Sequence, residues 1–253
     1  MKLNALPIIV SLFLAASAWG LDPLPKAPAF DGPNCWNAAL KAVRILPHFR
    51  FTNAREMYFY SKSPLCYPIE PSEKQPGDIG LIRAEQVAGP GEFHAFVMVS
   101  ENGVYSKNGM KQSTPYVYWT LDAVLRFYTS PPLPLTFIRC HSLAIYLENH
   151  PGIPGFYLET LNEITAYEKD LEQLVMKNIA MGENRERDIY PIAQKYLDNL
   201  QVHQNEANDM ANEERTFIQG VIKERLLSIA AQLSHANKAY LLVELGAMFG
   251  RLP

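Results

Sequence analysis

The sequence contains none of the short motifs that mark the commonest cofactor-dependent enzymes. It has no GxxxxGK[ST] or GxGxxG pattern, so nothing indicates a nucleotide site. It has no GxSxG pattern, which excludes the usual strand-turn-helix elbow of serine hydrolases. HExxH, paired CxxC and EF-hand patterns are also missing, so a metal site has no motif to support it. We therefore expect neither a metal ion nor another cofactor.

An excess of charge of one sign is missing too. The 253 residues include 23 Lys and Arg against 26 Asp and Glu, a formal net charge of −3. Such a balance produces no positive field, so we expect no nucleic-acid partner. Hydrophobic residues make up 48% of the chain, which is typical of a globular protein and excludes an extended disordered chain.

Long hydrophobic runs are absent except at the N-terminus. Residues 1–20 combine a basic residue, Lys2, with an apolar run over residues 6–18 and the small residues Ala18 and Gly20. This pattern is typical of a secretory signal peptide, whereas a membrane-spanning helix needs about 20 apolar residues. A buried N-terminal helix and an uncleaved anchor are the alternatives. The pattern predicts an exported protein, periplasmic or secreted, whose mature chain begins at Leu21.

Cysteine is scarce, with only Cys35, Cys66 and Cys140. In an oxidising compartment cysteines tend to pair, and an odd number leaves at least one thiol free or bonded to a partner. Cys66 lies between prolines and lacks the electropositive setting of a nucleophile. A Cys66–Cys140 disulfide is therefore a candidate, because it would leave Cys35 free.

Proline is almost absent from the second part of the chain, and its distribution suggests the domain organisation. Seventeen of the 19 prolines lie at or before Pro154. Because proline breaks helix interiors, we expect turns, strands and short helices over residues 21–150 and long helices over residues 151–253. Apolar residues at spacings of three and four predict two or three helices in this C-terminal region, as a hairpin or small bundle. The polar run over residues 201–214 is expected to continue a long helix.

The proline-rich part predicts a helix followed by strands. CWNAALKAVRIL, residues 35–46, has the pattern of a helix, and Asn34 is a good N-cap. Strand patterns follow at residues 79–82, 94–100 and 104–107, and Asn102-Gly103 between the last two is a strong hairpin signal. Helix and antiparallel strands in separate segments predict the α+β class.

Two residues of this part are suited to nucleophilic catalysis. Cys35 lies in the first turn of the predicted helix, where unpaired backbone N–H groups and the helix dipole favour a thiolate. His94 opens a strand 59 residues later and supplies a candidate base. The next strand returns beside it, so Asn108, or Ser106 as the alternative, is expected to orient the imidazole. Asp78 is expected to be a turn residue.

The order of these pieces resembles the NlpC/P60 superfamily of papain-like cysteine peptidases, with the CHAP domain as a close second. The matching segments are Asn34-Cys35-Trp36, Pro76-Gly77-Asp78-Ile79 and His94-Ala95-Phe96-Val97-Met98, within about residues 30–130. The family usually has Asp before the cysteine and Ser-Gly after it, whereas this chain has Asn34 and Trp36-Asn37. The resemblance implies a helix packed on a small antiparallel sheet and hydrolysis of amide bonds, usually in bacterial cell-wall peptides.

The sequence thus predicts an exported thiol amidohydrolase that cleaves peptidoglycan stem peptides. Cys35 would attack the carbonyl, His94 would transfer the proton, and Asn34 and Trp36 would contact substrate. Two alternatives stay open. One is a catalytically silent binding or scaffold module of the same fold, with a protein partner held by the C-terminal helices. The other is a thiol acyltransferase.

Overall fold

The computed structural model describes residues 32–83, 92–111, 113–128, 134–176, 189–234 and 239–250. The predicted signal peptide, residues 1–20, lies outside these ranges. Among the described helices, none is both long and apolar enough to cross a bilayer.

The described chain is a mixture of helices and one antiparallel sheet, which agrees with the predicted α+β class. In chain order the elements are α2 (Cys35–Ala42), α3 (Ala54–Ser61), β1 (Cys66–Ile69), the 3-10 turn η1 (Pro71–Glu73), β2 (Ile79–Arg83), β3 (Glu92–Met98), β4 (Gly103–Lys107), β5 (Tyr116–Thr120), α4 (Leu121–Tyr128), β6 (Leu135–Cys140), α5 (Leu143–Asn149), α6 (Gly155–Met176), α7 (Ile189–Val202), α8 (Gln204–Asp209), α9 (Asn212–Ser234) and α10 (Ala239–Phe249).

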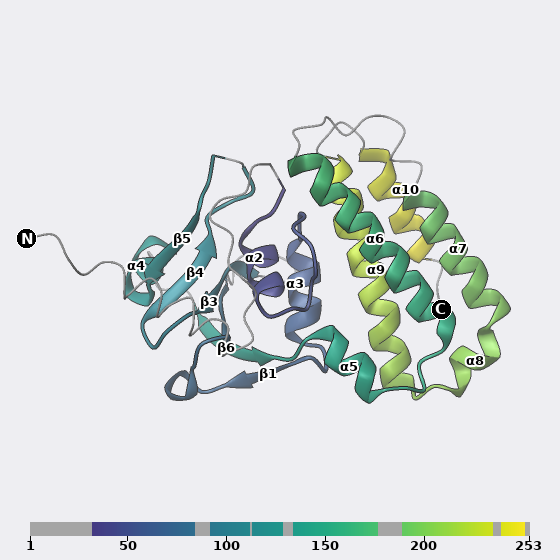
Figure 1. Cartoon of the computed structure of the whole chain (residues 1–253), viewed down its shortest axis with the longest axis horizontal. Coiled ribbons are helices and arrows are strands. Elements are labelled where there is room, and N and C mark those ends of the chain that lie inside the picture. The colour runs from purple at the N-terminus through teal and green to yellow at the C-terminus, as the bar shows by residue number, and fades with distance from the viewer. Residues whose placement is uncertain are drawn as a thin grey trace, which may run out of the picture.

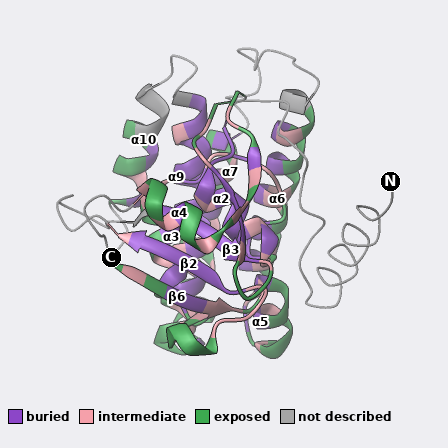
Figure 2. Cartoon of the chain, turned by 90° about the vertical axis from the view of Figure 1, so that its left-hand side faces the viewer, coloured by how far each residue is buried: buried purple, intermediate pink, exposed green. Residues whose placement is uncertain are grey.

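The sheet has six strands in the order β1-β6-β2-β3-β4-β5, and every neighbouring pair is antiparallel. Successive side chains of β3 point to opposite faces, so Ala95 and Val97 join the core beneath α2 while Phe96 and Met98 pack toward α4. Figure 1 shows this layering, with α2 and α3 between the sheet and helices α6 and α9, and α4 on the outer side of the sheet. Figure 2 shows β2 and β3 buried and α4 largely exposed.

Helix α2 begins where the sequence predicts. The Asn34 side chain accepts a hydrogen bond of 3.0 Å from the backbone N–H of Asn37, so the helix starts at Cys35. It ends four residues before Leu46, because Arg44 adopts a left-handed conformation with φ of 61°. This is the usual way for a chain to leave a helix, and it lets the following apolar residues turn back into the core.

One hydrophobic core crosses the predicted boundary at residue 150. It contains Leu40 of α2, Val97 of β3 and Leu161, Ile189 and Ile222 of the C-terminal helices. The change in proline content therefore coincides with a change of architecture, but the sheet and the helices share buried surface.

Buried ion pairs strengthen the same junction. Arg50, between α2 and α3, binds Glu56 through two hydrogen bonds of 2.6 and 2.8 Å and Glu168 of α6 through one of 2.6 Å. Arg225 of α9 also binds Glu168. All four side chains are buried, so two cations offset two anions away from water. Burial alone would raise the pKa of Glu168, but Arg225 and Arg50 hold it below its usual value.

The expectation of one long helix through residues 201–214 is wrong. The chain forms α8 there, and Met210, in an extended conformation, separates it from α9. Ala207 and Met210 are buried, so the turn is anchored on the core, but most of the run is exposed to solvent as expected. Arg215 holds it by donating to the carbonyl of Ala207 and the side chains of Asn208 and Asn212.

A disulfide and an ion pair hold the far edge of the sheet. Cys66 of β1 and Cys140 of β6 are register partners and form a disulfide, and Cys35 is the free cysteine. Asp78, predicted as a turn residue, is buried at the start of β2. Its carboxylate accepts 2.8 and 3.0 Å hydrogen bonds from Arg139 and one of 2.7 Å from the backbone of Gln75. Its role is therefore structural.

Candidate functional site

Cys35 is the first residue of α2, and its thiol points into the interior of the molecule. The residue is only 7% exposed. The backbone N–H groups of Ala95 on β3, of Trp36 and of Cys35 itself act on the sulfur as hydrogen-bond donors and lower its pKa. N–H groups at a helix start have no partner within the helix, so they are free to stabilise a thiolate or an oxyanion.

His94 lies immediately before Ala95, so the chain that contacts the Cys35 sulfur also carries the imidazole. The ring is 2% exposed, and its Nε2 lies 2.9 Å from the Ser106 hydroxyl on β4. Within the described part of the chain, no hydrogen bond joins the Cys35 sulfur directly to the ring. His94 is thus one residue away from the N–H that acts on the sulfur, and its side chain points to the face of β3 opposite to that of Ala95.

The Ser106 hydroxyl lies 2.9 Å from Nε2 of His94 and 3.4 Å from the carbonyl oxygen of Ala95. A hydroxyl has one hydrogen to donate, so both contacts are satisfied together when it donates to the carbonyl and its oxygen accepts from Nε2–H. In that arrangement Nδ1 of the neutral imidazole is unprotonated and able to accept a proton.

Ser106, not Asn108, contacts the imidazole of His94. The sequence favours Asn108 on the assumption that the strand continues through it, but β4 ends at Lys107. The Asn108 side chain instead accepts a 2.9 Å hydrogen bond from the hydroxyl of Tyr128. Asn108 thus acts on the site through Tyr128, whose ring stacks on His94 with 3.8 Å between ring centroids.

Burial keeps both members of the pair neutral at rest. Desolvation raises the pKa of the Cys35 thiol to about 11, against the lowering effect of the N–H groups and of the Lys107 charge. Desolvation also lowers the pKa of His94 to about 3. Burial raises the pKa of Tyr128 as well, and its proximity to Cys35 adds to that effect. The resting site therefore holds a thiol and an uncharged imidazole.

The two residues predicted to contact substrate have other surroundings. Asn34 is buried; its oxygen caps α2 and its Nδ2 donates a 2.7 Å hydrogen bond to the carbonyl of Thr52. It therefore positions Cys35 and does not present a surface to substrate. Trp36 is half-buried against the main core, and its indole N–H has no hydrogen-bond partner among the described residues.

Sequence reasoning missed Tyr128 and Lys107. Tyr128 ends α4, far along the chain from His94, and no short-range pattern connects the two. Lys107 looks like an ordinary charged residue at a strand end, but its side chain is fully buried. Its position in the strand gives one indication: Lys107 follows Ser106, so its side chain points to the opposite face of the sheet, which α2 covers.

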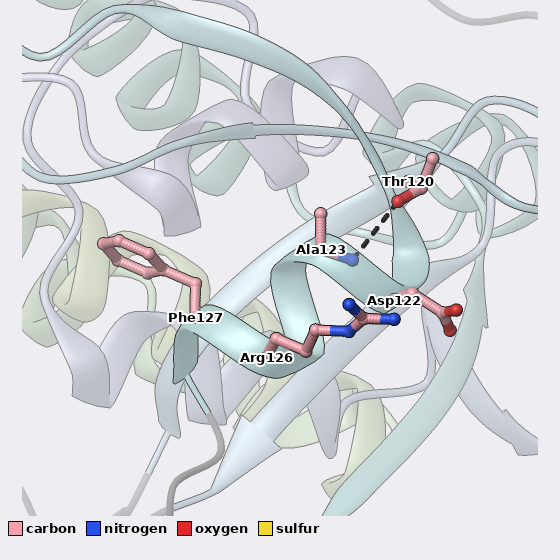
Figure 3. Close-up of a pocket in the computed structure, with 5 residues that line it drawn as sticks. All are labelled: Thr120, Asp122, Ala123, Arg126 and Phe127. Carbon is pink, nitrogen blue, oxygen red and sulfur yellow. Dashed lines mark hydrogen bonds between the residues drawn. The ribbon is translucent and has the colours of Figure 1, made fainter.

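The surface around α4 has a pocket of its own, which Figure 3 shows. It is lined by Thr120, Asp122, Ala123, Arg126 and Phe127, and the Thr120 hydroxyl accepts from the backbone N–H of Ala123 at 3.2 Å. None of its lining residues is a cysteine, histidine or serine. Over the ranges that the structure describes, no group of three or more His, Cys, Asp or Glu side chains has the arrangement of a metal site.

Comparison with models of known protein families, with curated proteins and with solved structures found no match to this chain.

Proposed function

We propose that this protein is a thiol amidohydrolase of the NlpC/P60 type, exported from the cell and acting on amide bonds of peptidoglycan stem peptides. One observation carries the proposal: the Cys35 sulfur lies at a helix start against the N–H of the residue that follows His94, and Nε2 of His94 lies 2.9 Å from the Ser106 hydroxyl. The proposal assigns to these groups the four roles of nucleophile, base, orienting group and oxyanion donor.

The chemistry follows from these four parts. As the Cys35 sulfur attacks the amide carbon, the thiol proton passes to Nδ1 of His94, and the backbone N–H of Cys35 stabilises the developing oxyanion. The tetrahedral intermediate collapses when the carbon–nitrogen bond breaks, and Nδ1–H gives its proton to the leaving amine. A water molecule, deprotonated by Nδ1, then attacks the thioester and releases the carboxylic acid and the thiol.

Two features support the wider assignment. The order of Cys35 at a helix start and His94 on a strand beneath that helix is the order of the papain-like fold that the resemblance implies. The Cys66–Cys140 disulfide fits a protein that folds in an oxidising compartment, because disulfides persist there and are rare in the cytosol.

The test is digestion of purified peptidoglycan by the full chain, with the fragments identified by mass spectrometry. We expect new amine and carboxylate ends with the wild type and none with Cys35→Ala or His94→Gln. His141→Gln removes an exposed imidazole directly after β6; it is the matched control and should retain activity. Equal activity in all variants would exclude Cys35 and His94 from the reaction.

A silent binding module is the second candidate, and the closed site favours it. Cys35 and His94 are both nearly inaccessible and Tyr128 covers the imidazole, so substrate reaches the thiol only after side chains move. A groove of about 800 Å³ between α7, α8, α9 and α10, lined by polar residues such as Gln194, Asn208 and Arg215, offers a separate partner surface. A binding module would keep its affinity for cell wall in Cys35→Ala and never form a thioester.

The thiol acyltransferase is distinguished by the fate of the acyl group. A transferase and a hydrolase would both form a thioester on Cys35, visible as a mass increase of the intact protein. Hydrolysis regenerates the enzyme with water alone, whereas transfer requires an added amine or hydroxyl acceptor. The acceptor dependence of turnover therefore decides between them.

A further inference from the structure

The helical region carries a groove that the proposed chemistry does not use. It lies between α7, α8 and α9, is lined by side chains of residues 190–219 together with Met248 of α10, and has a volume of about 800 Å³. Ligand pockets usually measure about 300–1,000 Å³, so a molecule of moderate size fits this space, which we call the helical groove. Figure 1 shows α7 and α8 at the end of the molecule opposite to the sheet, so the helical groove is separate from the thiol site.

Amide side chains dominate the lining of the helical groove. Six of its 14 lining residues are Asn or Gln, whereas the whole chain has 15 Asn and 9 Gln among 253 residues. An amide both donates and accepts hydrogen bonds and carries no charge, so the groove suits a ligand rich in uncharged donors and acceptors. The six amides come from three helices and are Gln194, Gln201, Gln204, Asn208, Asn212 and Gln219.

The two charged residues of the lining both have partners within the groove. The Asp198 carboxylate accepts a 2.8 Å hydrogen bond from the Gln194 amide. The Arg215 guanidinium donates to the side-chain oxygens of Asn208 and Asn212 at 2.8 and 2.9 Å. One acid and one base leave the lining without net charge. Arg215 also fixes both asparagines by their oxygens, so their NH2 groups are positioned to donate to a ligand.

These features match an uncharged carbohydrate better than other classes of ligand. A charged ligand would require an excess of the opposite charge in the lining. Peptides are usually bound at a sheet edge, as a helix in an apolar groove or as a proline-rich segment on aromatic residues, and a helical wall rich in amides is none of these. Sugar hydroxyls both donate and accept, and an N-acetyl group presents an amide that Asn and Gln complement.

A few apolar side chains of the lining complete the match. Tyr190, near the start of α7, is 40% exposed and offers a flat ring to the C–H face of a sugar. The half-buried Leu197 and Met248 offer apolar surface to the methyl group of an acetamido substituent. The helical groove thus combines amides for the polar atoms of an N-acetylated sugar with apolar contacts for its C–H groups.

We propose that the helical groove binds the glycan chain of peptidoglycan through its uncharged, N-acetylated sugars. The choice of polymer rests on the proposed function, because peptidoglycan carries glycan and stem peptide on one molecule. A groove that holds the glycan raises the local concentration of stem peptides at the thiol site, even where a single glycan contact is weak. The C-terminal helices then act as a substrate-binding region.

Titration calorimetry of the full chain carrying Cys35→Ala tests binding apart from cleavage. Chitotetraose, a soluble chain of N-acetylglucosamine, is the probe, and cellotetraose, which has hydroxyls in place of the acetamido groups, is the matched sugar. The key variant combines Gln201→Ala with Gln204→Ala, because both side chains are exposed on the groove and their removal does not disturb the core. Asn205→Ala, at an exposed amide of α8 outside the lining, is the matched control.

We expect chitotetraose to bind, and the double variant to raise its Kd about 5- to 100-fold, the range for the loss of two hydrogen bonds between uncharged groups. Asn205→Ala should keep the original Kd, and cellotetraose should bind more weakly than chitotetraose. An absence of chitotetraose binding, or an equal Kd in the double variant and in Asn205→Ala, would overturn the inference.

Placing a charge in the groove tests the class of ligand on the polymer itself. In a pelleting assay with purified peptidoglycan, Gln204→Glu and Gln204→Lys should lower retention of the Cys35→Ala chain to a similar degree, because the bound sugars are uncharged. Added chitotetraose should compete with the peptidoglycan. Retention raised by one charge and lowered by the other would mean that the groove attracts charged parts of the polymer, contrary to the inference.

The outcomes separate this inference from the proposed function. Cleavage of peptidoglycan by the wild type without chitotetraose binding would refute the glycan site alone. Chitotetraose binding without any cleavage would refute the hydrolase and leave the glycan site in place. Pelleting with chitin but not with peptidoglycan would contradict the choice of polymer, and a soluble stem peptide that binds the groove in place of chitotetraose would assign it to the peptide.

Discussion

Replacing His94 by glutamine should change how the stability of this protein depends on pH. Burial lowers the pKa of His94 to about 3, whereas a histidine in an unfolded chain titrates near 6.5. As the pH falls through 6.5, His94 takes up a proton in the unfolded chain but stays neutral in the folded protein. The contribution of His94 to the free energy of unfolding is therefore at its maximum above pH 6.5 and decreases progressively down to pH 3.

The size of the effect follows from the two pKa values. Between pH 7 and pH 5 the unfolded histidine becomes almost fully protonated while the folded one stays neutral, which costs about 2 kcal/mol of unfolding free energy. The wild-type protein should thus lose about 2 kcal/mol more than His94→Gln over this interval. The comparison cancels the contributions of the carboxylates and the other histidines, because both proteins share them.

Urea unfolding followed by circular dichroism at pH 7 and pH 5 measures this difference. His141→Gln removes an exposed imidazole by the same substitution and serves as the control. If the wild type and His94→Gln lose stability equally between the two pH values, His94 titrates in the folded protein as it does in water. The conclusion that His94 is neutral in the folded protein because it is buried would then be refuted.

Three further predictions concern the site and the framework. Ser106→Ala should lower kcat/KM on a cleaved substrate by up to about 100-fold, because the contact that orients the His94 imidazole is lost. Asn108→Ala should have a smaller effect. Steady-state kinetics in which Asn108→Ala is the more damaging variant would contradict the assignment. Glu168→Gln should destabilise the protein by about 3–5 kcal/mol in urea unfolding, since it leaves the buried Arg225 without a counter-charge, and an unchanged midpoint would argue against the ion network. Cys66→Ser should cost about 4 kcal/mol, because the disulfide closes a loop of 74 residues, and alkylation of unfolded wild-type protein under non-reducing conditions should find one free thiol, not three.

The local patterns of the sequence identify the start of α2 and the strands β2, β3 and β4, but not the other three strands of the sheet. Asn34 is the N-cap as predicted, because its short polar side chain can accept a hydrogen bond from the backbone N–H of Asn37 in the first turn. The hairpin around Asn102 joins β3 and β4 as the dipeptide signal predicts. Both features are determined by residues close together in the sequence, so a local sequence pattern can predict them.

The choice between Ser106 and Asn108 depends on where a strand ends, which the pattern does not contain. Both residues share one face of an ideal strand, and only the end of β4 at Lys107 removes Asn108 from it. The partner of Asn108, Tyr128, belongs to α4, 20 residues further along the chain. The packing of α4 on the sheet brings the two together, and no residue near Asn108 indicates it.

The ion network of Arg50 and Glu168 shows the same limit for the framework. Charged residues in an amphipathic helix are normally read as its solvated face, and Glu168 is such a residue in α6. It is buried because Arg50 and Arg225 approach it from two other segments. A charge whose partners are distant in sequence gives no signal until the chain is folded.

The neutral resting state limits how the proposed reaction starts. Moving a proton from a thiol with a pKa of about 11 to an imidazole with a pKa of about 3 would cost about 11 kcal/mol without any attraction between the products. An enzyme that turns over about 10 times per second has a total barrier near 16 kcal/mol, so too little would remain for the attack on the amide. The attraction between thiolate and imidazolium, together with Lys107 and the N–H groups, must lower the cost of this proton transfer by several kcal/mol. Proton transfer is therefore expected to accompany attack on bound substrate, and free Cys35 at pH 7 should react more slowly with iodoacetamide than an exposed cysteine.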